Sequence, residues 1–294
     1  MQNIGKELHK STGAFNVAVE SKRQPRILDL WKAPGGFLSA AMEYNPGAVV
    51  TACSLPVEAG GHQVLLPRHV DIDTRMLDIT MLAADVGAVD ISEDHPDLAN
   101  FIPKQFHGLR EFDIVLGDGQ VLRTHSRAAY REHSEPRRLA VTQLALGLEH
   151  LREGGTIVVL LYKVEEPRTL EVLHQFHQFS AVRLFKHAKV HSKRSSFYMV
   201  ATNVQVEHPE AVRAVEDWKQ VWKVATFGDE EAYKELVRRD GSWADRILDS
   251  FGSALVQLGE PIWAIQARAL ESAPFIKDPA ATPQSFRQWR RGAK

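Results

Sequence analysis

The chain has 294 residues, enough to bury the core of one large domain or of one domain with an appendage. Hydrophobic residues make up 44% of it and charged residues 25%, and the formal net charge of −1 excludes a globally basic nucleic-acid-binding protein. The single cysteine, Cys53, excludes a disulfide framework and a cysteine-built zinc site. The amino terminus has no apolar signal-peptide core, and no run of about 18 apolar residues occurs. We therefore expect an intracellular protein, cytoplasmic or nuclear, that makes no membrane contact.

Residues 1–23 have a loosely helical pattern that ends in a polar stretch. From residue 24 to residue 204, short apolar runs alternate with amphipathic stretches, which predicts a mostly parallel α/β sheet with helices on both faces. The runs lie at residues 27–30, 49–53, 76–79, 114–116, 157–162, 182–185 and 197–201. The last two runs have no helix between them, so we expect them to form an antiparallel pair at one edge of the sheet.

Residues 205–294 show helical patterns, and five of the six tryptophans lie there. Aromatic residues at helical spacing usually belong to a core, so we expect a carboxy-terminal helical annex that packs on the sheet domain. A lid over a substrate is the alternative interpretation of this region.

A Pro-Gly-Gly turn, Pro34 to Gly36, follows the first predicted strand and precedes a predicted helix. Ligands of α/β sheets bind at the carboxyl ends of the strands, and glycines let a backbone approach a ligand closely. Asp29 ends the strand, where its carboxylate could order the turn or meet a charged ligand group. The turn is neither the dinucleotide-binding motif nor the phosphate-binding loop.

Four segments between Lys10 and Asn203 resemble, in the right order, the motifs of the FtsJ-like methyltransferases. The segment LDLWKAPGGF resembles the family's S-adenosylmethionine motif, roughly D-L-G-x-x-P-G-G-(W/F), and FDIVLGDG resembles its fourth-strand motif. LREGGTIVVLLYK and HSKRSSFYMVATN resemble its penultimate and last segments. Further details, including SLPVEAGGH and DGQVLRTH, are most similar to fungal FtsJ-domain proteins. The resemblance implies a Rossmann-like methyltransferase sheet. It also implies an enzyme that methylates ribose 2′-hydroxyls of RNA with S-adenosyl-L-methionine as cofactor.

The resemblance also implies which residues hold the cofactor. The methionine part of the cofactor is expected to lie against Asp29 and the turn made by Pro34, Gly35, Gly36 and Phe37.

Three further positions bear on the cofactor. Asp85 stands where methyltransferases bind the adenine amino group, and Ser54 stands where many of them present an acid to the ribose. Trp31 occupies a position that is glycine in the family motif. We expect Trp31 and Ser54 to weaken cofactor binding.

Active family members carry a Lys-Asp-Lys-Glu tetrad. A ribose hydroxyl must lose its proton to attack a methyl group, and a lysine of lowered pKa can accept or steer that proton. The first lysine corresponds to Lys10, with Lys6 as the alternative, and the aspartate corresponds to Asp118.

The other two tetrad positions are occupied by different residues. The second lysine falls on Leu160, and Lys163, three residues later, can compensate only if the strand bulges or has ended before it. The family glutamate falls on Ser196.

Basic residues near these motifs are candidates for substrate binding. Residues 183–194 carry five Lys or Arg and no acid, so Lys189, Lys193 and Arg194 could bind RNA phosphates, unless the segment is simply a solvated hairpin loop. Arg123 and His125 follow Asp118 closely, where His125 is either a general base or a structural histidine. The sequence shows no metal-ligand cluster.

Three functions therefore remain open at this point. The chain is an RNA ribose methyltransferase, a methyltransferase-fold enzyme acting on a small molecule, or a non-catalytic relative that binds cofactor, RNA or a protein. Neither the substrate nor the oligomeric state follows from the sequence.

Overall fold

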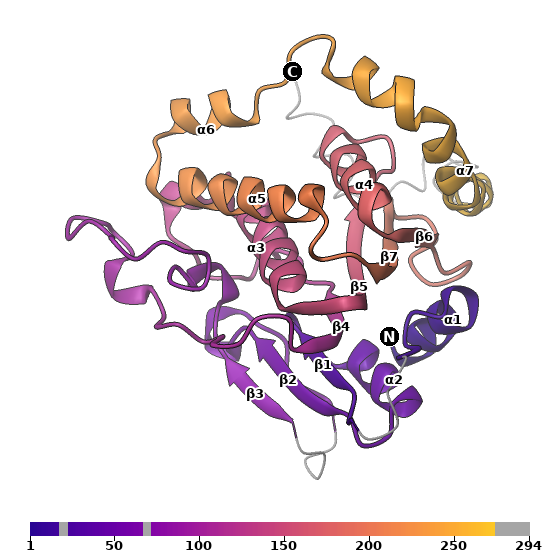
Figure 1. Cartoon of the computed structure of the whole chain (residues 1–294), viewed down its shortest axis with the longest axis horizontal. Coiled ribbons are helices and arrows are strands. Elements are labelled where there is room, and N and C mark those ends of the chain that lie inside the picture. Colours follow the sequence, from indigo (N-terminus) through magenta and orange to yellow (C-terminus); the bar gives the residue numbers. More distant parts are fainter. Residues whose placement is uncertain (18–22, 67–71, 274–294) are drawn as a thin grey trace.

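The computed structural model describes residues 1–17, 23–66 and 72–273. In these residues one seven-stranded sheet has the strand order β3-β2-β1-β4-β5-β7-β6 (Figure 1). Strands β1 to β5 are parallel, and β7 runs antiparallel to both β5 and β6. The predicted α/β sheet and its antiparallel pair are confirmed. The strands are β1 Arg26–Asp29, β2 Val49–Ser54, β3 Asp73–Met76, β4 Phe112–Gly117, β5 Leu151–Tyr162, β6 Ala181–Phe185 and β7 Ser196–Val204.

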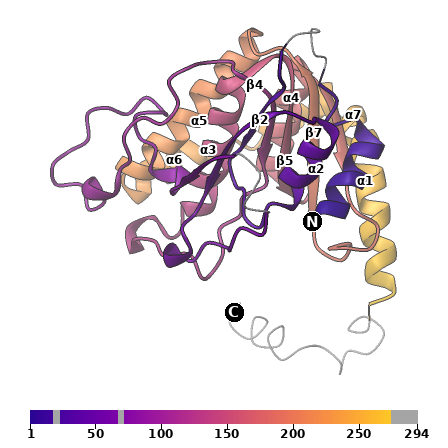
Figure 2. The same ribbon diagram turned by 90° about the horizontal axis from the view of Figure 1, so that it is seen from below.

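Helices cover both faces of the sheet, with α1 and α2 on one face and α3, α4 and α5 on the other (Figures 1 and 2). The helices are α1 Gln2–Thr12, α2 Gly36–Tyr44, α3 Glu135–His150, α4 Pro167–Phe179, α5 Pro209–Phe227, α6 Glu230–Val237 and α7 Trp243–Glu271. Short 3₁₀ segments lie at Val57–Ala59, Ile79–Met81, Leu98–Asn100 and Ala129–Arg131. No helix in the described part of the chain is long and apolar enough to cross a membrane.

The central strands are apolar on both faces because each face is covered by helices. Along β5, Ile157 and Val159 belong to the core under α3, α4 and α5, whereas Val158 and Leu160 belong to the core under α1 and α2. This alternation explains why the strands appear in the sequence as continuous apolar runs.

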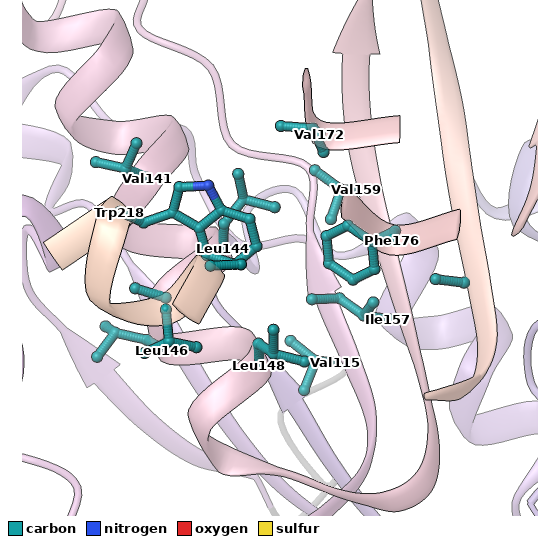
Figure 3. Close-up of a cluster of buried hydrophobic side chains, with 14 of the residues drawn as sticks. Val115, Val141, Leu144, Leu146, Leu148, Ile157, Val159, Val172, Phe176 and Trp218 are labelled. Atoms are coloured by element: carbon teal, nitrogen blue, oxygen red, sulfur yellow. The ribbon is translucent and has the colours of Figure 1, made fainter. Parts of the chain in front are cut away.

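The carboxy-terminal helix α5 completes the larger core, as expected for an annex that packs on the sheet. Trp218 is 2% exposed and stacks on Phe176 of α4 with ring centroids 5.9 Å apart. Figure 3 shows both rings among aliphatic side chains of α3, β4 and β5. Trp222 is also buried, and its indole nitrogen donates to the Thr80 carbonyl at 3.0 Å. The last residues of the predicted annex, 274–294, lie outside the described residues.

The predicted position of the third strand is wrong by three residues. The strand is Asp73–Met76, and residues 79–81 form a 3₁₀ turn because the Asp78 carboxylate caps the Thr80 amide at 2.9 Å. β3 is an edge strand whose side chains are largely exposed, so it lacks the apolar run that marks the central strands. The apolar run that follows it is buried beneath α3 instead.

We expect Trp218→Ala to lower the free energy of unfolding by about 3–5 kcal/mol, because it leaves a large cavity between α5 and α4. Urea unfolding followed by circular dichroism measures this. Val212→Ala, on the exposed side of the same helix, should change stability by no more than about 0.5 kcal/mol. Equal effects of the two variants would contradict the integral role of α5.

Candidate functional site

A crevice lies where β1 and β4 meet, at the point where the strand order reverses. In doubly wound sheets this is the place where ligands bind. Asp29 is the last residue of β1, paired in register with Leu116 of β4, and Asp118 follows β4 directly. The fold thus brings together two acids that are far apart in the sequence.

The two carboxyl groups have raised pKa values. Asp29 is 2% exposed, and this burial raises its pKa; the charge of Asp118 raises the pKa further. The Trp31 amide, which donates to Asp29 Oδ1 at 2.9 Å, lowers it. Burial raises the pKa of Asp118 to about 7. The ammonium of buried Lys32 attracts Asp29 but donates to Thr74 Oγ1 at 2.6 Å. With two acids and one lysine, the crevice favours a cationic ligand group.

The Trp31 side chain occupies much of the crevice. A Cβ atom on Gly119 would lie 2.7 Å from Trp31 Cδ2, so only glycine fits beneath the indole ring. The other side of the ring meets His125, with ring centroids 5.6 Å apart. A space of about 10 Å³ remains, enough for roughly one water molecule. It is lined by residues that follow β1 to β4, including Leu55, Asp78 and Thr80.

Three buried polar atoms near this crevice have no hydrogen-bond partner among the described residues. They are the hydroxyl of Ser54, at the end of β2, Nε2 of His125 and Nε of Arg127. Buried polar atoms are normally paired, so these three are available to a polar ligand. Ser54 therefore stays a candidate for the ribose side of a nucleoside.

The Pro-Gly-Gly turn adopts the conformation that requires glycine. Gly35 has φ +99°, and a Cβ atom there would lie 2.6 Å from Leu66 Cγ. Leu65 donates its amide to the Pro34 carbonyl at 3.1 Å, and Gly36 lies directly against Met1 of the α1 terminus. The close approach predicted for the turn exists, although its partners here are other parts of the chain.

Two predicted cofactor residues lie apart from the crevice. The Asp85 carboxylate accepts the Gln105 amide (3.0 Å) and the Phe106 amide (2.8 Å), so it already holds that loop. Phe37 is buried under α1 and packs on Tyr198 with ring centroids 4.7 Å apart. Their roles in cofactor binding remain predictions.

The predicted lysines are exposed or paired with other residues. Lys10 is exposed in the last turn of α1, and Lys6 pairs with Glu43 of α2 at 2.7 Å. β5 ends at Tyr162, and Lys163 follows in a left-handed conformation with φ +45°, exposed to solvent. The strand therefore ends before Lys163, but the Lys163 side chain remains exposed to solvent.

Two tyrosines, which the sequence reasoning missed, lie near Asp118 instead. β5 and β7 pair Leu160 with Tyr198 and Tyr162 with Ser196, so all four side chains share one face of the sheet. Burial raises the pKa of Tyr162 to about 12 and raises that of Tyr198 as well; the charge of Asp118 adds to both shifts. Both hydroxyls therefore remain protonated donors at neutral pH.

The basic segment before β7 divides into structural and free cations. Lys186 is buried and donates to three backbone carbonyls of the following loop, at 2.6–3.4 Å. His187 pairs with Glu7 of α1 at 3.3 Å. The predicted RNA-binding cations are exposed, namely Lys189, Lys193 and Arg194, and so is Arg123 in the loop after β4.

Arg194 lines a pocket of about 60 Å³ that also includes Leu160 and Ser196, the two replaced tetrad positions. The basic segment thus borders the place where the family tetrad would lie. In the described residues no group of three or more His, Cys, Asp or Glu side chains could hold a metal ion.

The model of the FtsJ-like methyltransferase family matches residues 7–204, more than half of the chain. The chain belongs to the FtsJ-like methyltransferase family. The predicted family and its cofactor, S-adenosyl-L-methionine, are thereby confirmed. None of the curated proteins is similar enough in sequence to count as a match.

Solved structures similar to this FtsJ-like methyltransferase include a ribosomal RNA methyltransferase from Plasmodium falciparum, with 16% identity and a TM-score of 0.42, covering 68% of this chain and 93% of that one. Human methyltransferase-like protein 13, in complex with S-adenosylhomocysteine, has 12% identity and a TM-score of 0.42, with 81% and 95% covered. Human N-acetylserotonin methyltransferase, in complex with S-adenosylmethionine, has 12% identity and a TM-score of 0.35, with 68% and 52% covered.

The residues of the crevice fit the charge of S-adenosylmethionine, which carries an ammonium and a sulfonium. Asp29 and Asp118 supply the negative charge, and Ser54 Oγ and His125 Nε2 supply unpaired polar atoms. The Trp31 ring leaves a space of only about 10 Å³ beside these residues, so we expect the ring to compete with the cofactor for room.

We expect Trp31→Gly to bind S-adenosylmethionine more tightly than the wild type. Displacing a half-buried indole costs about 1.5–3 kcal/mol, so calorimetry should show an affinity gain of roughly 10-fold to 100-fold. Trp31→Phe keeps an aromatic ring in place and should stay closer to the wild type. If Trp31→Gly and Trp31→Phe bind the cofactor with the wild-type affinity, the ring is not the obstacle.

Proposed function

We propose that this FtsJ-like methyltransferase methylates a hydroxyl of RNA, the ribose 2′-hydroxyl, with Asp118 as the general base. The observation that carries the proposal is the position of Asp118 at the switch point between β1 and β4, with a pKa of about 7. A carboxyl group with an ordinary pKa near 4 is a weak base, whereas one near 7 combines useful basicity with ionisation at neutral pH.

The reaction needs a hydroxyl that loses its proton as it attacks. S-adenosylmethionine supplies the electrophilic methyl group. Asp118 accepts the hydroxyl proton, and the protonated hydroxyls of Tyr162 and Tyr198 can donate hydrogen bonds to the acceptor and to the Asp118 carboxylate. The half-buried side chain of Leu160 adds an apolar surface next to Tyr198.

The exposed cations of the segment before β7 support RNA as the acceptor. Arg194 lines a pocket together with Leu160 and Ser196, Lys189 and Lys193 are exposed in the same segment, and residues 183–194 include no acid. A local strip of this kind can bind phosphates even though the chain has a net charge of −1.

We expect the methylation rate to rise through about pH 7 and to level off above it, because Asp118 must be deprotonated to accept the proton. Asp118→Asn keeps the shape of the side chain but cannot act as a base, so the rate should fall by at least about 10²-fold. Single-turnover transfer of labelled methyl groups to RNA over a pH series measures both. A pH-independent rate, or an Asp118→Asn variant with the wild-type rate, would exclude Asp118 as the base.

We expect neutralising the three exposed cations together (Lys189→Gln, Lys193→Gln and Arg194→Gln) to weaken RNA binding at low salt. The slope of log affinity against log salt concentration should fall by about two, because each lost phosphate contact with a single strand contributes roughly 0.7. Filter binding over a salt series measures this slope.

The matched control removes three exposed cations from α6, α7 and the loop between them: Lys234→Gln, Arg238→Gln and Arg246→Gln. It should leave the slope unchanged. If the wild type binds S-adenosylmethionine but methylates no RNA, the proposal fails and the small-molecule or non-catalytic function takes its place.

A further inference from the structure

A second, larger pocket lies between the amino-terminal ends of α3 and α4, beyond the carboxyl end of β5. Its volume is about 350 Å³, in the range of small-molecule sites. Its walls are mainly apolar side chains, and Figure 3 shows three of them, Leu144, Val159 and Val172, converging from α3, β5 and α4. Two of its lining residues, Leu160 and Tyr162, also belong to the proposed methyl-transfer centre, whereas the part between α3 and α4 has no role in the proposed reaction.

One charged residue of the pocket wall, Arg137 on α3, has an unusual environment. Its side chain is 8% exposed, and its Nε has no hydrogen-bond partner among the described residues. Its contact with Glu171, at 3.7 Å, is too long for a hydrogen bond. Glu171 is instead held by Arg239, at 2.6 and 2.9 Å. Arg137 therefore presents a largely buried side chain whose Nε donor is unused.

A guanidinium in this state is costly, because a buried charge needs a partner and hydrogen bonds to compensate for lost water. Burial accordingly lowers the pKa of Arg137. The planar fork of an arginine matches a carboxylate, which can accept two parallel hydrogen bonds. The site therefore lacks one anionic group with the shape of a carboxylate.

The neighbouring charges leave room for such an anion. Glu166 uses its carboxylate to cap α4, accepting the amides of Arg168 and Thr169 at 2.9 and 3.1 Å. Arg168 also lines the pocket, where it adds a second positive charge near Arg137. An anion placed at Arg137 is therefore also attracted by the charge of Arg168, whose own partner Glu166 lies 3.9 Å away.

We propose that this pocket binds a small amphipathic carboxylate. Its apolar body lies between α3 and α4, and its carboxylate pairs with the fork of Arg137. The site adjoins the proposed methyl-transfer centre, because Gly119 and Gln120, directly after Asp118, and also Leu160 and Tyr162 line the pocket. The proposal does not depend on the nature of the methyl acceptor.

Calorimetry with decanoate, and with decanol as its uncharged counterpart, tests the proposal on the full chain. The wild type should bind decanoate at least about tenfold more tightly than decanol, since only the carboxylate can pair with Arg137. Arg137→Met should remove this preference and leave decanol binding unchanged. Ala140→Leu, which narrows the pocket on the α3 side, should weaken the binding of both compounds.

Arg213→Met, an arginine on the exposed side of α5, is the matched control and should bind both compounds like the wild type. The thermal midpoint of the ligand-free protein adds an independent measurement. Arg137→Met should keep or raise the midpoint, because it removes an unpaired buried charge. A merely structural ion pair with Glu171 would make the same variant less stable.

The proposal is overturned if the wild type binds neither compound, if it binds both equally, or if Arg137→Met keeps the preference for decanoate. A lowered thermal midpoint for ligand-free Arg137→Met would also overturn it. None of these measurements involves methyl transfer, so a failure here and a failure of the RNA-methylation proposal are distinguishable.

Discussion

The burial of two neighbouring carboxyl groups sets the chemistry of the crevice. The sheet order places Asp29 and Asp118 at the ends of adjacent strands, where burial makes it costly for both to be ionised. Lys32 compensates only part of this charge, because its ammonium also donates a hydrogen bond to Thr74. A cationic ligand group relieves the repulsion, and a proton on one of the two acids relieves it when no ligand is bound. The preference for a cationic cofactor and the pKa of about 7 for Asp118 therefore both follow from the burial of these acids.

The helix α5, in the carboxy-terminal part of the chain, helps to hold the walls of this crevice in place. Arg138 of α3 is fully buried, and its guanidinium donates to Glu135, to Thr226 Oγ1 of α5 and to the Thr80 carbonyl, at 2.7, 3.0 and 3.0 Å. Trp222 of α5 donates to the same carbonyl. The turn after β3, which lines the crevice, is thus held by a buried network that spans two helices. Loss of α5 would remove that support as well as part of the core.

The features that the sequence could predict are those set by local pattern. Apolar runs buried on both faces marked the central strands, and the glycine turn followed from its backbone conformation. The predictions that failed concerned features that depend on contacts between distant segments. The edge strand β3 has few buried side chains, so it left no apolar signal. That Lys163 points to solvent depends on where β5 ends, and the unpaired state of Arg137 appears only once α3 and α4 are placed together.

The replaced tetrad residues have a consequence for Asp118 itself. A lysine in place of Leu160 would put a positive charge near Asp118 and lower its pKa, because an opposite charge stabilises the carboxylate. Leucine at that position brings no charge, and Tyr198, paired with it across β5 and β7, has a neutral hydroxyl, so burial remains the main influence on the pKa of Asp118. On the predicted alignment, leucine at position 160 therefore leaves the pKa of Asp118 high enough for the base that we propose.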